Sequence, residues 1–232
     1  MYNSLVRIQN TFGFFTTVAF VVGMLIAATD VLSARDPSGS LLKATNVQVV
    51  RGRPHYYSTK KEEYAIIKFS MDADLSSLFT WNTKQVFVYV TAEWPAAAEA
   101  ANANANANAT NQAVIWDTII TSPSADHLSN LGPATLKKLI KSAKGKSIDP
   151  SRGILKLKNQ RPKYQITHPS GKIASAADVR LRLHYNVQPW VGVLAWDQTH
   201  TELGPWATVK GGLSAPFPLP AIKVKETPKA RA

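Results

Sequence analysis

Cysteine is absent from the 232 residues of this chain, which excludes both a disulfide framework and a thiolate metal site. Common enzyme motifs are absent too: the sequence has no Gly-x-Ser-x-Gly nucleophile turn, no His-Glu-x-x-His zinc motif and no glycine-rich loop for phosphate or dinucleotide binding. The five histidines stand beside prolines, in expected loops or on the polar side of an expected strand, so we expect surface histidines rather than bases. The sequence therefore predicts no catalytic residue, no bound metal ion and no cofactor.

Charge is absent over a long stretch near the N-terminus. About 22 residues between Arg7 and Asp30 carry no charge and are largely apolar. As a helix, this stretch would be about 33 Å long, enough to cross a hydrocarbon core of about 30 Å. We therefore expect a transmembrane helix over 12–32, preceded by a short cytosolic segment over 1–11.

The charges that flank this stretch predict its orientation. Arg7 and the α-amino group precede it, while acidic residues accompany Arg35 after it, so the positive-inside rule favours a cytosolic N-terminus and a lumenal domain over 33–232. A cleavable signal peptide, cut near Ala28 or Ala34, is the alternative. Because the apolar region of signal peptides is about 7–15 residues long, the longer run here favours an uncleaved signal anchor.

Alternation of apolar and polar residues predicts strands in the remainder, since alternate side chains of a strand lie on the same face. We expect strands over 45–51, 64–73, 112–120, 154–158, 163–167 and 179–187, and another around Val86 to Ala92. This last strand is apolar on both faces, which predicts a central place in a sheet. In the strand 112–120, Val114, Trp116 and Ile120 are expected to share a face. A short helix is expected over 134–143. The expected fold is thus an N-terminal transmembrane α-helix followed by a mainly-β lumenal domain, an antiparallel β-sandwich with long insertions.

Two stretches depart from this pattern. Residues 96–110 are almost wholly Ala and Asn, which predicts a disordered low-complexity loop. Residues 137–172 hold eleven basic residues and one acidic residue, and so most of the net charge of +12. We expect a long, partly disordered basic insertion there, solvated or else attracted to anionic lipid or an acidic partner. Nucleic acid is not an expected partner, because a lumenal domain would not meet it. Asn108 begins an Asn-x-Thr triplet and is a candidate N-glycosylation site.

Three blocks resemble the third subunit of eukaryotic signal peptidase complexes. They are MDADLSSLFTWNTKQVFVYVTAE over 71–93, NQAVIWD over 111–117 and HYNVQPWVGVL over 184–194, and they follow an N-terminal anchor in the same order as in that family. Asn10 and Phe12 before the anchor and the late Pro-Phe-Pro over 216–218 fit the same family. Two features depart from it: Tyr185 stands where the family often has Trp, and 177–179 lack the family's usual glycosylation triplet. The two insertions are similar to those of fungal members.

The resemblance implies a non-catalytic accessory subunit in the endoplasmic-reticulum membrane, a single-pass type II protein. The implied partners are the catalytic subunit, which carries the nucleophile on a separate chain, the small membrane subunits of the complex, and the lipid bilayer through 12–32. The implied role is to support removal of signal peptides by packing on the catalytic subunit and holding its geometry, because a displacement of 1 Å can cost about a hundredfold in rate. The alternative is a secreted or membrane-bound β-sandwich binding module unrelated to peptidase.

Two segments are candidates for contact with partners. Trp81, Asn82, Lys84 and Gln85 stand where a turn enters a strand, and a Trp beside polar groups suits an interface, although Trp81 filling the core and Asn82 closing the turn is the alternative. The apolar stretch from Pro189 to Trp196 is expected to be buried in the core, with contact to the bilayer interface or a partner groove as the alternative.

Overall fold

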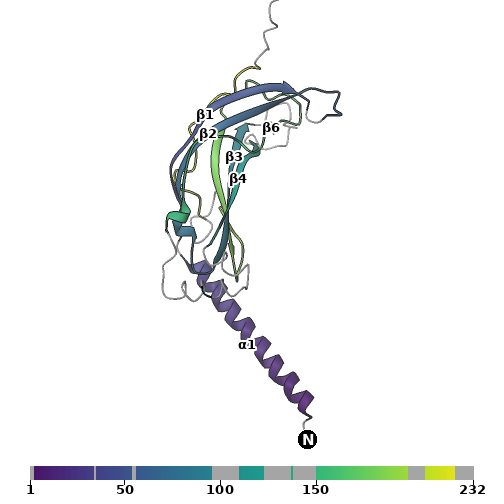
Figure 1. The fold of residues 1–232 in the computed structure, drawn as a ribbon, viewed down its shortest axis with the longest axis vertical. Helices are drawn as coiled ribbons and strands as arrows, with labels where there is room; N and C mark the ends of the chain where they lie inside the picture. Colours follow the sequence, from purple (N-terminus) through teal and green to yellow (C-terminus); the bar gives the residue numbers. More distant parts are fainter. Residues whose placement is uncertain are drawn as a thin grey trace, which may run out of the picture.

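The fold is described from a computed structural model, which describes residues 3–33, 35–53, 56–95, 110–122, 137, 150–197 and 207–222. One long helix projects from the end of an elongated, curved β domain (Figure 1). The sequence prediction of an N-terminal apolar helix followed by a mainly antiparallel β domain is therefore confirmed.

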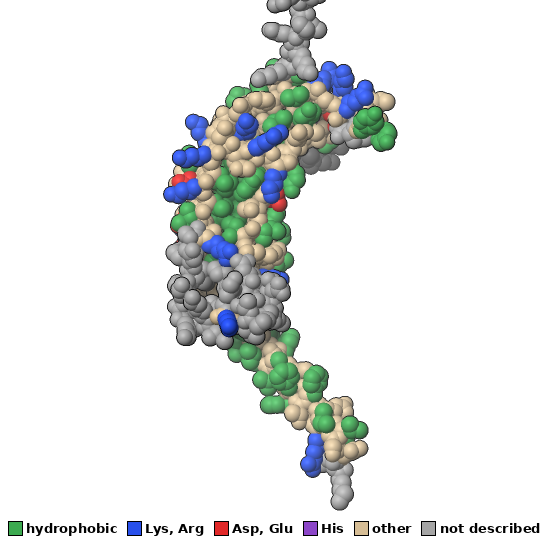
Figure 2. All heavy atoms as spheres, in the orientation of Figure 1, with side chains coloured by type: hydrophobic (Ala, Val, Ile, Leu, Met, Phe, Trp, Pro, Cys, Tyr) green, Lys and Arg blue, Asp and Glu red, His purple; other side chains and the backbone are tan. Residues whose placement is uncertain are grey.

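Helix α1 runs over Ser4–Leu32. Hydrophobic side chains lie along the face of the helix that Figure 2 shows, and a basic side chain lies near its N-terminal end. The hydroxyl groups of Thr11, Thr16, Thr17 and Thr29 donate to backbone carbonyls of the preceding turn at 2.7–2.9 Å, which satisfies polar groups within the helix itself. In the part of the chain that the structure describes, α1 is the one helix long and apolar enough to cross a membrane.

The β domain is a sandwich of two antiparallel sheets. The first has the strand order β1-β2-β5 with β6 paired to β2, and the second has the order β4-β3-β7-β8. The bounds are β1 Ser38–Gly52, β2 Glu62–Asp74, β3 Thr83–Pro95, β4 Thr110–Thr121, β5 Ile154–Gln160, β6 Ile166–Thr167, β7 Arg180–Pro189 and β8 Ala195–Trp196, with 3₁₀ turns η1 at Ser76–Leu78 and η3 at Pro150–Gly153. Strand β3 lies between β4 and β7, the central place that its two apolar faces predict.

The first sheet extends well beyond its sequence prediction. Strand β1 has 15 residues, because its pairing with β2 continues through two irregularities in register. At the end of β2, Asp74 accepts a hydrogen bond from the backbone N–H of Ser76 at 2.9 Å and begins η1. Hydrogen bonds from the Ser76 side chain and backbone lower the pKa of Asp74. Within the expected basic insertion, the described residues 150–172 form η3, β5 and β6, in agreement with the two short strands predicted there.

The second sheet contains a bulge that changes which side chains of β4 face inward. Trp116 pairs with Val90 but Val114 pairs with Thr91, so one extra residue of β4 stands between these pairs. As a result Ile115 and Trp116 are both buried, whereas Val114 is 41% exposed. The expectation that Val114 and Trp116 share a face is therefore wrong, because strict alternation fails at a bulge.

The core lies between the two sheets. Inward side chains of β2, β3 and β7 are fully buried, and Tyr185 is the largest of them. Its hydroxyl donates to the carbonyl of Ala207 at 2.5 Å. The rings of Phe69 and Trp116 meet edge to face with centroids 5.9 Å apart, which joins the two sheets through an aromatic contact.

The segment 207–222 completes the domain without forming a long strand. It pairs with β7 through the isolated bridges Arg182–Leu213 and Val179–Phe217, and with the start of β1 through the bridge Ser38–Lys210. The backbone N–H of Gly39 donates to Lys210 at 2.7 Å. This late segment therefore ties the residues that follow α1 to the second sheet.

Candidate functional site

One cluster on the second sheet has the residue types of a hydrolase triad. Nδ1–H of His184 donates to Oδ2 of Asp197 at 2.6 Å, and Nε2 of the same ring lies 3.0 Å from Oγ1 of Thr91. Gln112 reaches the same hydroxyl and the same ring nitrogen with its Nε2 atom, at 3.4 and 3.3 Å. The expectation that His184 is a surface histidine is wrong, since its side chain is 12% exposed and held on both nitrogens.

The geometry of this cluster does not suit nucleophilic catalysis. Thr91 is 1% exposed and stands in the middle of a central strand, so a substrate carbonyl cannot approach its hydroxyl. The ring of Tyr89 also covers His184, with centroids 4.9 Å apart and planes 14° apart. The cluster is a satisfied polar network that joins β3 and β7 to Asp197, the residue that follows β8.

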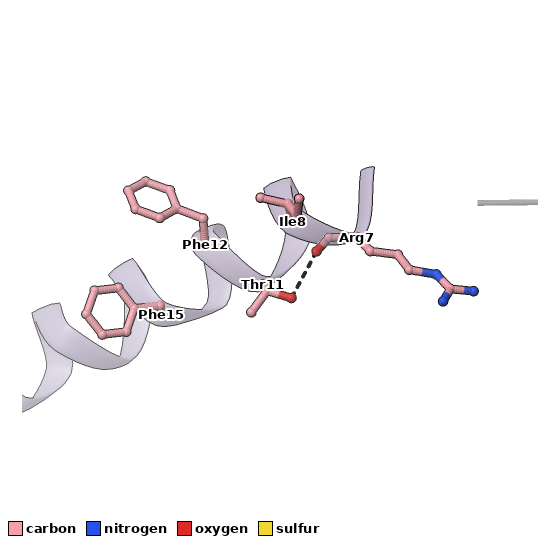
Figure 3. A pocket seen from close by; sticks show the side chains of 5 residues that line it. All are labelled: Arg7, Ile8, Thr11, Phe12 and Phe15. Carbon is pink, nitrogen blue, oxygen red and sulfur yellow. Dashed lines mark hydrogen bonds between the residues drawn. The ribbon is translucent and has the colours of Figure 1, made fainter. Parts of the chain in front are cut away.

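Two hollows of the described surface do not supply a catalytic centre either. One hollow lies on α1 alone, between side chains that no other described element covers (Figure 3). It is lined by Arg7, Ile8, Thr11, Phe12 and Phe15. Another, at the far end of the second sheet, includes His168, whose Nδ1 lies 2.7 Å from the Ser170 hydroxyl in a local turn. Among the residues that the structure describes, no group of His, Asp and Glu could hold a metal ion.

The structure brings the four candidate interface residues to the end of the domain nearest α1, in different environments. Trp81 is 67% exposed, whereas Asn82 is 2% exposed. Lys84 places its Nζ 5.3 Å from the centroid of the Trp190 ring. Gln85 donates from Nε2 to the side chain of Gln188 at 2.5 Å. Trp81 and Lys84 are therefore the members available to a partner.

Asn82 clamps the turn that follows β7. Its Oδ1 accepts from the backbone N–H of Val191 at 3.1 Å, and its Nδ2 donates to the carbonyl of the same residue at 2.7 Å. Its own carbonyl accepts from the N–H of Trp190 at 2.8 Å. These side-chain bonds hold a turn 109 residues away in sequence, and not the turn entering β3 that the alternative interpretation assigned to Asn82.

Most of the stretch from Pro189 to Trp196 is not buried in the core, so that expectation is wrong; within it only Ala195, 2% exposed, is a core residue. We call residues 190–194 the basal loop. Its exposed fractions are 40% for Trp190, 39% for Val191, 65% for Val193 and 47% for Leu194. The cause is that β7 ends at Pro189 and the Asn82 clamp then holds the turn outside the sandwich.

The basal loop and the domain meet one stripe of α1. Gly23, Ile26, Ala27, Asp30 and Val31 are the partly or fully buried residues of its last turns, and their spacing of three and four places them on one face. At the end of this stripe, Arg35 donates from Nη2 to Oδ1 of Asp30 at 2.7 Å, with side chains 0% and 6% exposed. The ion pair therefore locks the end of α1 to the domain.

A further surface was not predicted from the sequence. Phe87 faces outward on β3, beside Ile119 of β4 on one side and Asn186 of β7 on the other, and Asn186 in turn pairs with Trp196 of β8. Ile119 is 56% exposed and Trp196 is 46% exposed. Tyr89 stacks on Phe87 with centroids 5.4 Å apart. We call Phe87, Tyr89, Ile119 and Trp196 the aromatic face.

The aromatic face is adjacent to the candidate interface, since Gln85 precedes Phe87 on the same side of β3. Burial, followed by the negative charge of Asp197, raises the pKa of Tyr89, which keeps its phenol neutral at ordinary pH. The sequence did contain a pattern that indicates this surface: β3 is apolar on both faces, and the core covers only one of them.

Asn108, the low-complexity residues 96–109 and most of the expected helix 134–143 lie outside the described residues.

Comparisons with known proteins agree with the resemblance seen in the sequence. A family model described as a signal peptidase subunit matches residues 1–137 and 147–205. Signal peptidase complex subunit 3 of Debaryomyces hansenii is 26% identical over 209 residues, covering 86% of this chain and 90% of that protein. Its namesake from Saccharomyces cerevisiae is 34% identical over 140 residues, covering 60% of this chain and 56% of that protein. The protein of that name from Gallus gallus is 27% identical over 159 residues, covering 68% and 63%.

Proposed function

The chain belongs to the signal peptidase subunit family, and from this membership we propose that it is a non-catalytic accessory subunit of the signal peptidase complex in the endoplasmic-reticulum membrane. The observation that carries the proposal is the family match over both α1 and the β domain. A domain of this kind supports signal-peptide removal by packing on the catalytic subunit and holding its reacting groups in position. The buried environment of Thr91 supports the same conclusion, because the one triad-like cluster among the described residues cannot receive a substrate.

We further propose that α1 remains attached as a type II signal anchor, with Arg7 on the cytosolic side and the β domain in the lumen. Cleavage near Ala34 would remove Asp30 and leave the buried guanidinium of Arg35 without the carboxylate that compensates its charge, at a cost of several kcal/mol. Cleavage near Ala28 would keep both residues on the domain but remove the helical turns that precede Asp30. The domain therefore depends on the end of the helix that precedes it. Use of Asn108 as a glycan site stays a prediction.

Purification of the full chain from detergent-solubilised membranes tests the proposed function. We expect the catalytic subunit and the small membrane subunits to co-purify with a tagged chain, and we expect loss of the chain to reduce cleavage of a presecretory substrate. The isolated chain should not cleave that substrate. A tagged chain that purifies without these partners, or that cleaves the substrate unaided, would contradict the proposal.

The contact with the catalytic subunit is proposed to include Trp81 and Lys84 and to continue over the aromatic face. An exposed Trp beside a basic side chain is the composition of an interface hot spot. We expect Trp81→Ala with Lys84→Ala to weaken co-purification of the catalytic subunit by about tenfold, since two such side chains contribute about 1.4 kcal/mol or more.

The matched control for this double variant is Tyr57→Ala with Lys60→Ala in the turn between β1 and β2. It also removes an exposed aromatic ring and an exposed lysine, Tyr57 being 87% exposed. The control should co-purify the catalytic subunit as the unaltered chain does. Equal recovery of the catalytic subunit by both double variants would place the contact elsewhere.

A further inference from the structure

We propose that the basal loop, residues 190–194, enters the outer part of the bilayer beside α1 and gives the β domain a second point of contact with lipid. The proposal rests on the proposed membrane insertion of α1. The partner of the basal loop is the lipid bilayer, at the boundary between headgroups and acyl chains. The loop lies at the end of the domain from which α1 projects (Figure 1).

The position of the loop along α1 sets its depth. A methyl group placed on Gly192 would lie 3.6 Å from Cα of Ala27, and one placed on Gly23 would lie 4.0 Å from Cγ1 of Val191. Ala27 and Gly23 precede Asp30, the first charged residue after the apolar run, by three and seven positions. At 1.5 Å per residue the loop therefore meets α1 about 5–10 Å below that charge. This is the depth, about 5–10 Å, at which interfacial apolar segments are buried.

The composition of the loop suits that depth. No residue from Pro189 to Trp196 carries a charge. The apolar side chains of Val193 and Leu194 are 65% and 47% exposed, because nothing in the described domain covers them. Trp190 has Lys84 over its ring, so an amphipathic aromatic group and a cation stand together at the upper edge of the loop. Tryptophan with a neighbouring basic group is typical of the membrane interface.

The backbone at the start of the loop, at Trp190 and Val191, has polar groups that are paired within the protein. Polar backbone groups that enter lipid without a partner cost several kcal/mol each. Here Asn82 pairs the N–H of Trp190 and both the N–H and the carbonyl of Val191. Gly192 then turns the chain with φ of 134°, a conformation that favours glycine. The clamp thus removes three polar groups from solvent at the place where the apolar side chains project outward.

The absence of cysteine allows a direct test with one label per molecule. Three valines are replaced singly in the full chain: Val18→Cys in α1, Val193→Cys in the basal loop and Val114→Cys on β4. Val114 is 41% exposed but stands about 23 Å along β4 from the strand end nearest α1. Each variant carries an NBD fluorophore and is reconstituted into phosphatidylcholine vesicles. Lipids with a nitroxide at a shallow or a deep acyl position serve as quenchers.

We expect both quenchers to reduce NBD emission at position 18 and neither to reduce it at position 114. At position 193 we expect a blue-shifted emission that the shallow nitroxide quenches more strongly than the deep one. An unshifted, unquenched label at position 193 together with a quenched label at position 18 would overturn the loop contact while leaving the membrane anchor intact. A blue shift without quenching would overturn it too, since a protein surface would then cover the loop. An unquenched label at position 18 would refute the anchor itself, and the loop contact with it.

Discussion

Replacing Asp30 with alanine is expected to lower the free energy of unfolding of the β domain by about 3–5 kcal/mol, the usual cost of leaving a buried charge without its partner. Arg35 is fully buried and donates to Asp30 at 2.7 Å. Its Nε and Nη1 atoms have no hydrogen-bond partner among the described residues, so Asp30 is the one compensating group that this part of the structure provides. Thermal unfolding of the full chain in detergent, followed by tryptophan fluorescence, measures the effect.

The neighbouring pair Lys210–Asp36 provides a matched control. Its Nζ and Oδ1 atoms are 3.0 Å apart, but the side chains are 73% and 72% exposed. Asp36→Ala should therefore cost no more than about 1 kcal/mol. A combined Asp30→Leu and Arg35→Met variant should recover stability relative to Asp30→Ala, because no charge then stays buried. If Asp30→Ala lowered the free energy of unfolding no more than Asp36→Ala, Arg35 would be reached by water and the expectation would be wrong.

Phe69→Ala is expected to cost about 3–5 kcal/mol, because it opens a cavity between the two sheets. Phe69 is 0% exposed and its ring meets Trp116 edge to face, so the substitution removes both buried area and an aromatic contact. For a chain of this size the loss corresponds to a fall in Tm of about 6–20 °C. The fall in Tm would be measured by following the circular dichroism signal of the β domain during heating.

Leu41→Ala on β1 is the control for this cavity. Leu41 is 48% exposed on the outer side of the first sheet, where truncation should change stability by no more than about 0.5 kcal/mol. If Phe69→Ala lowered Tm no further than Leu41→Ala, the two sheets would not share the core described above.

The elements that could be predicted from the sequence are those with a local pattern. The uncharged run after Arg7 predicted α1, and the alternation in β2 and β7 predicted strands over 64–73 and 179–187, within a few residues of their observed bounds. These patterns arise because the environment of each side chain repeats with the geometry of its own element. Such patterns indicate which face of an element is apolar, but they do not indicate which strands are neighbours in a sheet.

The features that escaped prediction depend on pairing between distant segments. The bulge in β4 moved Val114 out of the core, and a register irregularity leaves no mark on composition. His184 was expected on the surface because its partners come from elsewhere in the fold, Thr91 from β3 and Asp197 from the residue after β8. The basal loop was expected in the core because its apolar residues suit both a protein core and an exposed apolar surface. The Asn82 clamp holds the loop outside the core, and this clamp joins residues 109 positions apart.

The late segment 207–222 has a consequence for biosynthesis. Synthesis runs from the N-terminus, so β1 and β7 are made before the segment 207–222 that adds to their outer edges. Until Lys210 reaches Gly39 and Gly212 reaches Leu183, both strands keep open backbone donors. Open edges of this kind are sites of mispairing, so the nascent domain should need protection by chaperones until translation has passed residue 222.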